Sequence, residues 1–390
     1  MIKKYKILFV ILIISSILFG CTNVQNKTNT SQKEPVNKKV IPLAPIETGK
    51  YDVEEILSKM TLKEKIYQMM FVTPESISSN VKDPLSDETM TQYPVGGIIY
   101  FSNNIESEEQ IKKTISETQN VSRIKLFIGV DEEGGRVSRL SGKTSIEKMP
   151  PMKEVGDLGD TNKANEIGKY LGKNLKEFGF NVDFAPVADV LIREDNDEIG
   201  DRSFGNDASL VATMVGEFVK GIEGEGVLSV LKHFPGHAST YKNSHNGYSE
   251  SERELNELRQ TELLPFKKGI ECGSKFVLVS HMTLVNATSE KLPSTLSKEV
   301  ITDLLINELS FKGIVITDSM SMGAITNEYS QKDAAVRCIK AGVDMILMPP
   351  SPKNAFDAIM EAVEKGEITE ERINESVRKI LKVKKEKGII

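Results

Sequence analysis

Residues 313–318 read Gly-Ile-Val-Ile-Thr-Asp, a run of β-branched residues that ends in a carboxylate. β-branched residues favour strands, and the lack of polar alternation predicts a strand buried on both faces, as in a parallel sheet. Similar short runs recur along the chain, and we predict strands at residues 70–73, 97–100, 127–131, 182–184, 229–233, 276–280, 314–317 and 345–348. Amphipathic stretches separate these runs, which is the pattern of repeated βα units.

The stretches between the predicted strands carry apolar residues at helical spacing. One set is Ala164, Ile167, Leu171, Leu175 and Phe178, and another is Val211, Met214, Val215, Phe218 and Ile222. Steps of three and four residues place each set on one face of a helix. A last helix is expected to begin after Thr369, a suitable N-cap. Eight strands joined by helices predict an α/β fold, a single (β/α)₈ TIM-type barrel over residues 50–390 with no second catalytic domain; a doubly wound open sheet is the alternative.

Residues 1–49 differ in composition from the rest and are expected to lie outside the fold. Three lysines among the first six residues precede an apolar run at 7–19, which is the layout of a secretory signal. Gly20-Cys21 at its end resembles the cleavage site of bacterial lipoproteins, so we predict a signal peptide at 1–21 with a lipid on Cys21. An uncleaved anchor helix is the alternative, although the run is short for a bilayer span.

The predicted lipid implies a location outside the cytoplasm, on the bacterial cell membrane. Residues 22–49 are polar and lack apolar periodicity, which predicts a disordered linker between the membrane and the barrel.

The composition of the chain excludes some classes of function. Of 390 residues, 39% are hydrophobic and 27% are charged, which is ordinary for a globular protein. The formal net charge of −6 argues against a nucleic-acid partner. Three cysteines are present, and Cys272 and Cys338 are expected to be packed thiols and not a disulfide. The oligomeric state is not indicated.

Ionisable side chains stand at the ends of several predicted strands. Asp131 ends the third strand, Lys232 and His233 end the fifth, and His281 and Asp318 follow the sixth and seventh. In a (β/α)₈ barrel the carboxyl ends of all strands open onto one face, where active sites lie. These side chains are therefore expected to converge on one cavity, although an acidic residue in such a place can also cap the next helix.

Three of the four histidines lie in the stretch 232–245, Lys-His-Phe-Pro-Gly-His-Ala-Ser-Thr-Tyr-Lys-Asn-Ser-His. A metal site is the obvious competing interpretation, because His233 and His237 are four residues apart. Pro235 and Gly236 would break any helix that presented both rings on one face, and no zinc-binding spacing is present. We therefore predict no metal.

Several stretches together resemble glycoside hydrolase family 3, in particular its bacterial β-N-acetylglucosaminidase (β-hexosaminidase) branch in lipoprotein form. They are residues 60–65 (Met-Thr-Leu-Lys-Glu-Lys), 95–101 (Val-Gly-Gly-Ile-Ile-Tyr-Phe), 128–140 (Ile-Gly-Val-Asp-Glu-Glu-Gly-Gly-Arg-Val-Ser-Arg-Leu), 183–190 (Asp-Phe-Ala-Pro-Val-Ala-Asp-Val), 199–204 (Ile-Gly-Asp-Arg-Ser-Phe) and 313–323. The most specific is 232–237, Lys-His-Phe-Pro-Gly-His.

The resemblance implies a role for each matching residue. Asp318 matches the nucleophile that forms a covalent glycosyl-enzyme, and His245 matches the acid/base histidine of this branch. The residues that match those holding the N-acetylglucosamine ring are Asp131, Arg139, Arg202, Lys232 and His233. A nucleophile and a proton donor on opposite sides of the anomeric carbon are what retaining hydrolysis requires, without a cofactor.

The resemblance therefore predicts a retaining exo-β-N-acetylglucosaminidase. Its substrate would be a terminal β-N-acetylglucosaminide, such as a muropeptide from peptidoglycan. A phosphorylase, a sugar-binding lipoprotein with a weakened site and a metal-dependent hydrolase are the alternatives.

The chain departs from this branch at one position of the predicted proton-transfer machinery. The acid/base histidine is normally preceded by Asp-Ser, but here the sequence is Asn243-Ser244-His245. Asn243 can accept a hydrogen bond yet supplies no negative charge to stabilise an imidazolium. We expect weaker proton transfer unless another carboxylate, such as Glu250, takes its place.

Overall fold

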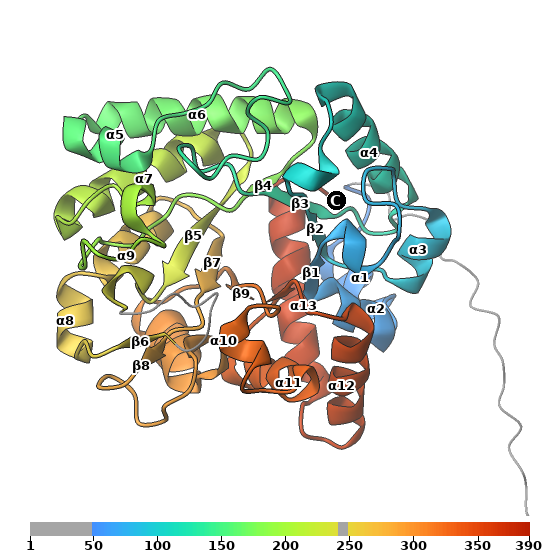
Figure 1. Ribbon diagram of the computed structural model, residues 1–390. Helices are drawn as coiled ribbons and strands as arrows, with labels where there is room; N and C mark the ends of the chain where they lie inside the picture. The colour runs from blue at the N-terminus through green and yellow to red at the C-terminus, as the bar shows by residue number, and fades with distance from the viewer. Residues whose placement is uncertain (1–48, 241–248) are drawn as a thin grey trace, which may run out of the picture. The chain divides into compact units, whose positions relative to one another are not determined.

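The computed structural model describes residues 49–240 and 249–390, which include eight parallel strands surrounded by helices (Figure 1). The strands are β1 (Met70–Val72), β2 (Gly97–Ile99), β3 (Phe127–Val130), β4 (Val182–Asp183), β5 (Leu228–Phe234), β7 (Phe276–Val279), β9 (Ile314–Thr317) and β10 (Ile346–Leu347). Their order in the sheet is β10-β1-β2-β3-β4-β5-β7-β9. All eight predicted strands are confirmed to within one or two residues at each end.

The two outer strands of this order also meet, which closes the sheet almost completely. Ile316 of β9 forms a parallel bridge with Met345 just before β10. The backbone N–H of Thr317 donates to the carbonyl of Met345 at 3.1 Å. The predicted (β/α)₈ barrel is confirmed, and the open doubly wound sheet is excluded.

Helices form the outer layer of the barrel. They are α1 (Val53–Ser58), α2 (Leu62–Gln68), α3 (Asp87–Gln92), α4 (Glu108–Val121), α5 (Met152–Leu158), α6 (Thr161–Phe178), α7 (Ala208–Gly224), α8 (Leu255–Gln260), α9 (Leu263–Glu271), the π-helix Glu299–Glu308, α10 (Gly323–Thr326), α11 (Gln331–Ala341), α12 (Pro352–Glu364) and α13 (Glu370–Glu386). The apolar residues predicted to face inward on α6 and α7 are buried. Thr369 caps α13 by accepting from the backbone N–H of Arg372 at 3.1 Å.

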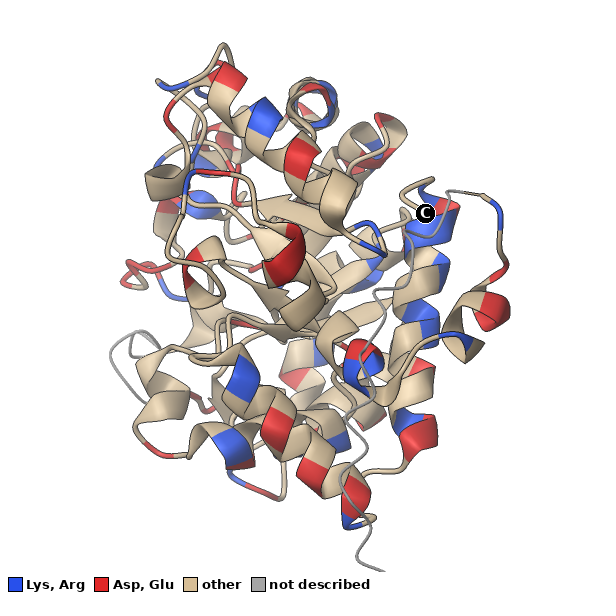
Figure 2. Cartoon of the chain, turned by 90° about the vertical axis from the view of Figure 1, so that its right-hand side faces the viewer, with Lys and Arg blue, Asp and Glu red and all other residues tan. Residues whose placement is uncertain are grey.

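The outer faces of the helices carry acidic and basic residues close together (Figure 2). Many form pairs four residues apart, such as Lys153 with Asp157 and Lys353 with Asp357. Such exposed pairs add little to stability but keep the surface soluble. Within the described ranges, no helix combines the length and apolarity needed to cross a membrane.

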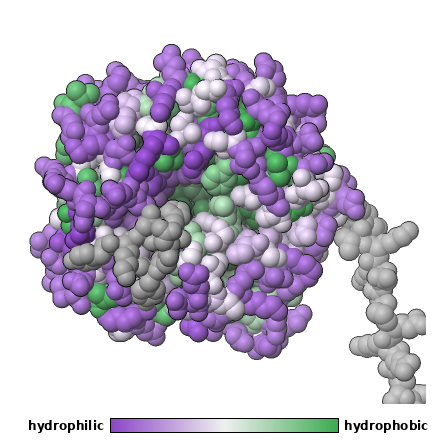
Figure 3. All heavy atoms as spheres, viewed as in Figure 1, coloured by the Kyte–Doolittle hydropathy of each residue, from purple (hydrophilic) through white to green (hydrophobic). Residues whose placement is uncertain are grey.

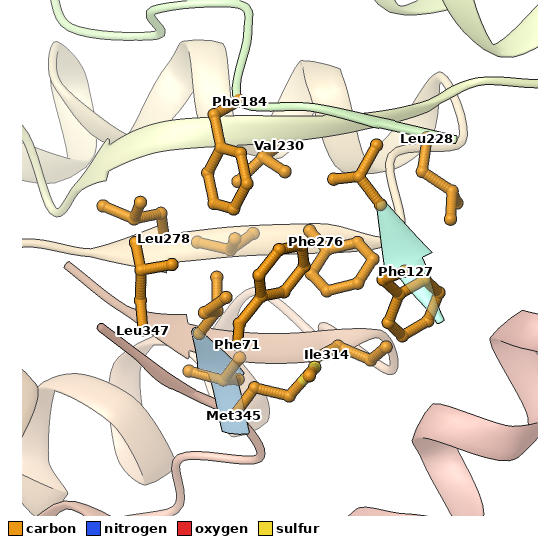
Figure 4. Packing of buried hydrophobic residues seen from close by; sticks show 14 of the residues in the cluster. Phe71, Phe127, Phe184, Leu228, Val230, Phe276, Leu278, Ile314, Met345 and Leu347 are labelled. Carbon is orange, nitrogen blue, oxygen red and sulfur yellow. The ribbon is translucent and has the colours of Figure 1, made fainter. Parts of the chain in front are cut away.

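Side chains from the strands fill the barrel interior (Figure 4). The rings of Phe71 and Phe184 meet edge to face with centroids 5.3 Å apart, and Phe127 and Phe276 do the same at 5.2 Å. Gly129 in β3 makes room for the first pair, because a Cβ there would lie 2.7 Å from Phe184 Cε2 and 2.8 Å from Phe71 Cζ. The interior is therefore a packed core and not a pore, as expected for eight strands.

A second, two-stranded sheet lies beside the barrel and was not predicted. It pairs β6 (Glu250–Ser251) with β8 (Thr283–Leu284) in parallel. Each strand has only two residues, too few for a pattern to be visible in the sequence. The backbone N–H of Thr283 also donates to the carbonyl of Ser249 at 2.8 Å, which extends this pairing by one residue.

Candidate active site

A cavity of about 510 Å³ lies at the carboxyl ends of the barrel strands. Its polar wall comprises Asp131, Glu133, Arg139, Glu198, Arg202, Lys232, His233 and Asp318, and its apolar wall includes Ile99, Phe101, Val137, Phe184, Leu278, Met322, Leu347 and Met348. Figure 3 shows that the face of the molecule seen in Figure 1 is hollowed near its middle. Most of the strand-end side chains that were predicted to converge on one cavity do line it: Asp131, Lys232, His233 and Asp318.

Three cations and two carboxylates form one network on a wall of this cavity. Lys232 Nζ lies 2.8 Å from Asp131 Oδ1 and 2.5 Å from Glu133 Oε1. Arg202 donates two hydrogen bonds to the carboxylate of Glu133, from Nη2 at 2.7 Å and from Nε at 2.8 Å. Arg139 Nη2 is 3.5 Å from Asp131 Oδ2. Each cation is thereby held in a fixed position with donors close to the cavity.

The ionic state of this network follows from its pairing. Burial alone would raise the pKa of Glu133, but Arg202 and Lys232 hold it well below its usual range. Burial likewise acts to lower the pKa of Lys232, and the carboxylates of Asp131 and Glu133 raise it above its ordinary value. Glu133 and Lys232 therefore stay charged at neutral pH, and the network can bind sugar hydroxyls through both donors and acceptors.

His233 is held by a fully buried carboxylate, Asp189. Its Nδ1 lies 2.8 Å from Asp189 Oδ2, and its backbone N–H donates to the same oxygen at 3.1 Å. Burial opposes the charge on Asp189, but His233 and His237 lower its pKa below the ordinary value. The carboxylate therefore accepts, so Nδ1 carries the hydrogen and Nε2 is left on the side of Arg202, whose Nη2 is 3.4 Å away.

Lys232 and His233 are consecutive, yet both line the cavity. In a regular strand neighbouring side chains point to opposite faces. The pairing of β5 with β7 is irregular between Leu231 and Phe234, which breaks this alternation. Because of this irregularity, two consecutive polar side chains at the end of β5 can both face the cavity.

Asp318 follows β9 and is fixed by its own backbone. Its N–H donates to the carbonyl of Val279 at 2.8 Å, and its Oδ1 accepts from the N–H of Ser319 at 2.7 Å. Burial would raise the pKa of Asp318, but His281 and His233 lower it below the ordinary value. Asp318 is therefore an ionised carboxylate at the cavity, in the state that a nucleophile needs.

The loop after β3 is organised by Glu132, which does not line the cavity. Its carboxylate accepts from the backbone N–H groups of Arg139 at 2.9 Å and Leu140 at 3.1 Å, and from the hydroxyl of Ser138. These bonds aim the Arg139 guanidinium over the ring of Phe101, 5.3 Å from its centroid. An arginine held over an aromatic ring is restricted in its motion, which suits a binding residue.

The predicted site residues fall into two groups. Asp131, Arg139, Arg202, Lys232, His233 and Asp318 all line the cavity. Asn243, His245 and the predicted lipidation site Cys21 lie outside the described residues.

Sequence reasoning missed three acidic residues at this site: Glu133, Asp189 and Glu198. Each lies inside or next to a stretch that the resemblance singled out. The sequence does not indicate which acid in a run such as Asp-Glu-Glu faces the cavity. These residues can be identified only from the side chains that they contact in the structure. Glu250, considered as a substitute carboxylate, is exposed on β6 and does not line the cavity.

Comparison with known proteins identifies the family of this chain. Residues 61–383 match the glycosyl hydrolase family 3 N terminal domain. A beta-hexosaminidase of Nitrosomonas eutropha is 31% identical over 281 residues, which cover 70% of this chain and 79% of that protein. Beta-hexosaminidase LpqI of Mycobacterium tuberculosis is 27% identical and is covered to 95%, as is this chain.

Solved structures give the same picture. A family 3 β-N-acetylglucosaminidase from Paenibacillus sp. FPU-7 superposes with a TM-score of 0.79 at 35% identity, covering 85% of this chain and 63% of that one. Among the relatives found by sequence, beta-hexosaminidase A of Pseudoalteromonas piscicida is 32% identical, and the match covers 77% of this chain but 55% of that protein. This chain therefore belongs to glycoside hydrolase family 3 and is related within that family to beta-hexosaminidases.

Proposed function

We propose that the protein is a retaining exo-β-N-acetylglucosaminidase. The observation that carries this proposal is that the ionised carboxylate of Asp318 shares one cavity with the network around Lys232. Asp318 would attack the anomeric carbon of a terminal N-acetylglucosamine while the leaving oxygen takes a proton. Water would then hydrolyse the glycosyl-aspartate with net retention.

The polar network supports the binding of a single sugar ring. Lys232, Arg139 and Arg202 supply donors, and Asp131 accepts, so each ring hydroxyl can find a partner in fixed geometry. The cavity of about 510 Å³ falls in the range of small-molecule sites, roughly 300–1,000 Å³. That size suits a terminal sugar with part of its leaving group.

We assign the proton donor to His245 on the strength of the sequence resemblance, and we place the enzyme outside the cytoplasm through a lipid on Cys21. Peptidoglycan fragments are the proposed source of substrate because they would be the nearest β-linked N-acetylglucosamine at that location. The names of the related beta-hexosaminidases support the sugar specificity.

Mass spectrometry of the intact protein tests this proposal. Incubation with a 2-fluoro N-acetylglucosamine analogue that carries an activated leaving group should add one glycosyl unit. Peptide mapping should place that unit on Asp318, and Asp318→Ala should neither be labelled nor release the sugar. Normal turnover by Asp318→Ala, or an adduct on a different residue, would overturn the assignment.

A further inference from the structure

Met348, on the apolar wall of the cavity, has an unusual backbone conformation. Among the residues that the structure describes, Met348 and Ser310 are the two non-glycine residues with positive φ, at 48° and 54°. A side chain in this left-handed region is strained, and glycine is the residue that normally occupies it. Met348 also precedes Pro349, and the residue before a proline favours extended backbone. Such strain is found mainly at functional sites, which suggests a function for the methionine side chain.

The left-handed backbone turns the Met348 side chain toward the cavity. Leu347, the last residue of β10, lies among the interior side chains in Figure 4 and lines the cavity. In a regular strand the next residue would point to the opposite side. Met348 nevertheless lines the cavity as well and is partly exposed. A glycine here would relax the backbone but leave this part of the cavity wall without a side chain.

Met348 lies on the nucleophile's side of the cavity and across the barrel from the polar network. The backbone N–H of Met320, two residues after Asp318, donates to the carbonyl of Leu347 at 3.0 Å. The network residues follow β3 and β4 or end β5, and β4 is four strands away from β10 in both directions around the nearly closed sheet. A sugar ring held by the network therefore lies between it and the wall that carries Asp318 and Met348.

The chemistry of the sugar indicates which of its faces meets this wall. In the chair form of a β-linked N-acetylglucosamine every substituent is equatorial, so both faces of the ring carry only axial hydrogens. The nucleophile attacks C1 from the side opposite the leaving oxygen, which is the face with the hydrogens of C1, C3 and C5. This face has no axial hydroxyl, so the flexible thioether side chain of a methionine can pack closely against it.

We infer that Met348 is a specificity-determining residue, whose side chain packs against the C1, C3 and C5 hydrogens of the terminal sugar; this rests on the proposed function. The contact favours rings in which these carbons carry equatorial substituents. An epimer at C3 would direct its hydroxyl into the methionine, where the oxygen would exchange water for a weak acceptor. An epimer at C4 carries its axial hydroxyl on the opposite face and would not meet Met348.

Steady-state kinetics of Met348→Gly test this inference on three 4-nitrophenyl N-acetyl-β-hexosaminides, namely the gluco substrate and its C3 (allo) and C4 (galacto) epimers. With the gluco substrate, kcat/KM should fall about 10–200-fold, the range for the loss of a methylene-sized contact in an apolar pocket. The preference for gluco over allo should narrow, because the C3 hydroxyl gains room and water. The preference for gluco over galacto should stay as in the parent.

Stability measurements separate this role from a structural one. Glycine tolerates positive φ better than alanine, so Met348→Gly should have a higher urea midpoint than Met348→Ala although both lose the contact. Ser310→Gly and Ser310→Ala are the matched controls, because Ser310 shares the backbone conformation but does not line the cavity. They should differ in urea midpoint in the same sense and keep the parent's kinetic constants.

Met348→Leu keeps an apolar side chain of similar volume and should retain most of the parent's activity together with its epimer preferences. Met348→Ala should show the same kinetic pattern as Met348→Gly, so the test does not depend on the folding of one variant.

The results that would overturn the inference are distinct from those that would overturn the function. An unchanged kcat/KM of Met348→Gly on the gluco substrate contradicts it. An equal change in both epimer preferences, or an unchanged rejection of the C3 epimer, also contradicts it, since a contact with the C–H face affects C3 alone. If the parent releases no N-acetylglucosamine and labels no residue, the proposed function fails, and the role of Met348 falls with it.

Discussion

Glu133 is the single carboxylate on which two cations of the cavity depend. It is 2% exposed and bridges Arg202 and Lys232. Without its charge the two cations would repel each other, since Arg202 already acts to lower the pKa of Lys232. The geometry of the proposed sugar-binding network therefore depends on a residue that acts mainly by holding Arg202 and Lys232 in place.

Glu133→Gln should weaken both stability and catalysis. Removing one partner of a buried ion pair costs about 3–5 kcal/mol of the free energy of unfolding. A displaced donor in the cavity should lower kcat/KM by roughly 10²-fold. Urea denaturation and steady-state kinetics measure the two effects. Glu361→Gln, which breaks an exposed pair with Lys365, should change neither, and a similar loss there would point to a non-specific effect.

His281 is expected to control the acidic limb of the pH profile. Its charge is the largest influence that lowers the pKa of Asp318 against the effect of burial. The proposed mechanism requires ionised Asp318, so in the parent this limb should lie below the usual aspartate pKa of about 3.9. His281→Asn removes the charge, raises the pKa of Asp318 and should move the limb of kcat/KM to higher pH. A limb that does not move would show that another group controls it.

In β3, the packing of two phenylalanine rings leaves no room for a side chain at position 129. Gly129→Ala would force its new methyl group against Phe71 and Phe184, and overpacking of this kind costs about 1–3 kcal/mol. Gly224→Ala, at the end of α7, meets nothing within 4 Å and should be neutral or slightly stabilising. Thermal unfolding of the two variants checks this contrast, and an equal effect would refute the packing argument.

The elements themselves could largely be predicted from the sequence. The eight barrel strands are continuous apolar runs, and α6 and α7 have clear helical spacing, so both patterns are local. The pair β6 and β8 could not be predicted, because two residues carry no periodicity and their pairing joins distant segments. The sequence also could not predict that the consecutive residues Lys232 and His233 both line the cavity, since this depends on an irregular pairing of β5 with β7.

The last helix, α13, crosses behind the strands in Figure 1. Lys384 on this helix is fully buried, with Nζ 2.9 Å from Gln68 Oε1 and 4.9 Å from the centroid of the Phe127 ring. Phe127 begins β3, so this contact lies at the opposite end of the strands from the candidate active site. A buried ammonium at this point links the last helix to the barrel.

Burial lowers the pKa of Lys384 to about 7, whereas an unfolded chain keeps a lysine near 10.4. Between these values the unfolded state binds more protons, so this group makes the free energy of unfolding rise from about pH 7 to about pH 10. Lys384→Met should raise stability at pH 7 and remove this slope. Urea midpoints at pH 7 and pH 9.5 measure it, with exposed Lys382→Met as the control. An identical slope in parent and variant would exclude Lys384 as its source.

The pairing of β1 with β10 affects how the protein folds during its synthesis. Met70, early in the chain, lies in register with Ile346, near its end, and the backbone N–H of Ile346 donates to the carbonyl of Met69 at 2.8 Å. Until the ribosome has released the last helices, β1 presents an uncovered edge, and edges of this kind recruit other strands. Biosynthesis therefore has to keep a nearly complete polypeptide from aggregating before the final strand arrives, and a prematurely terminated product would lack both closure and catalysis.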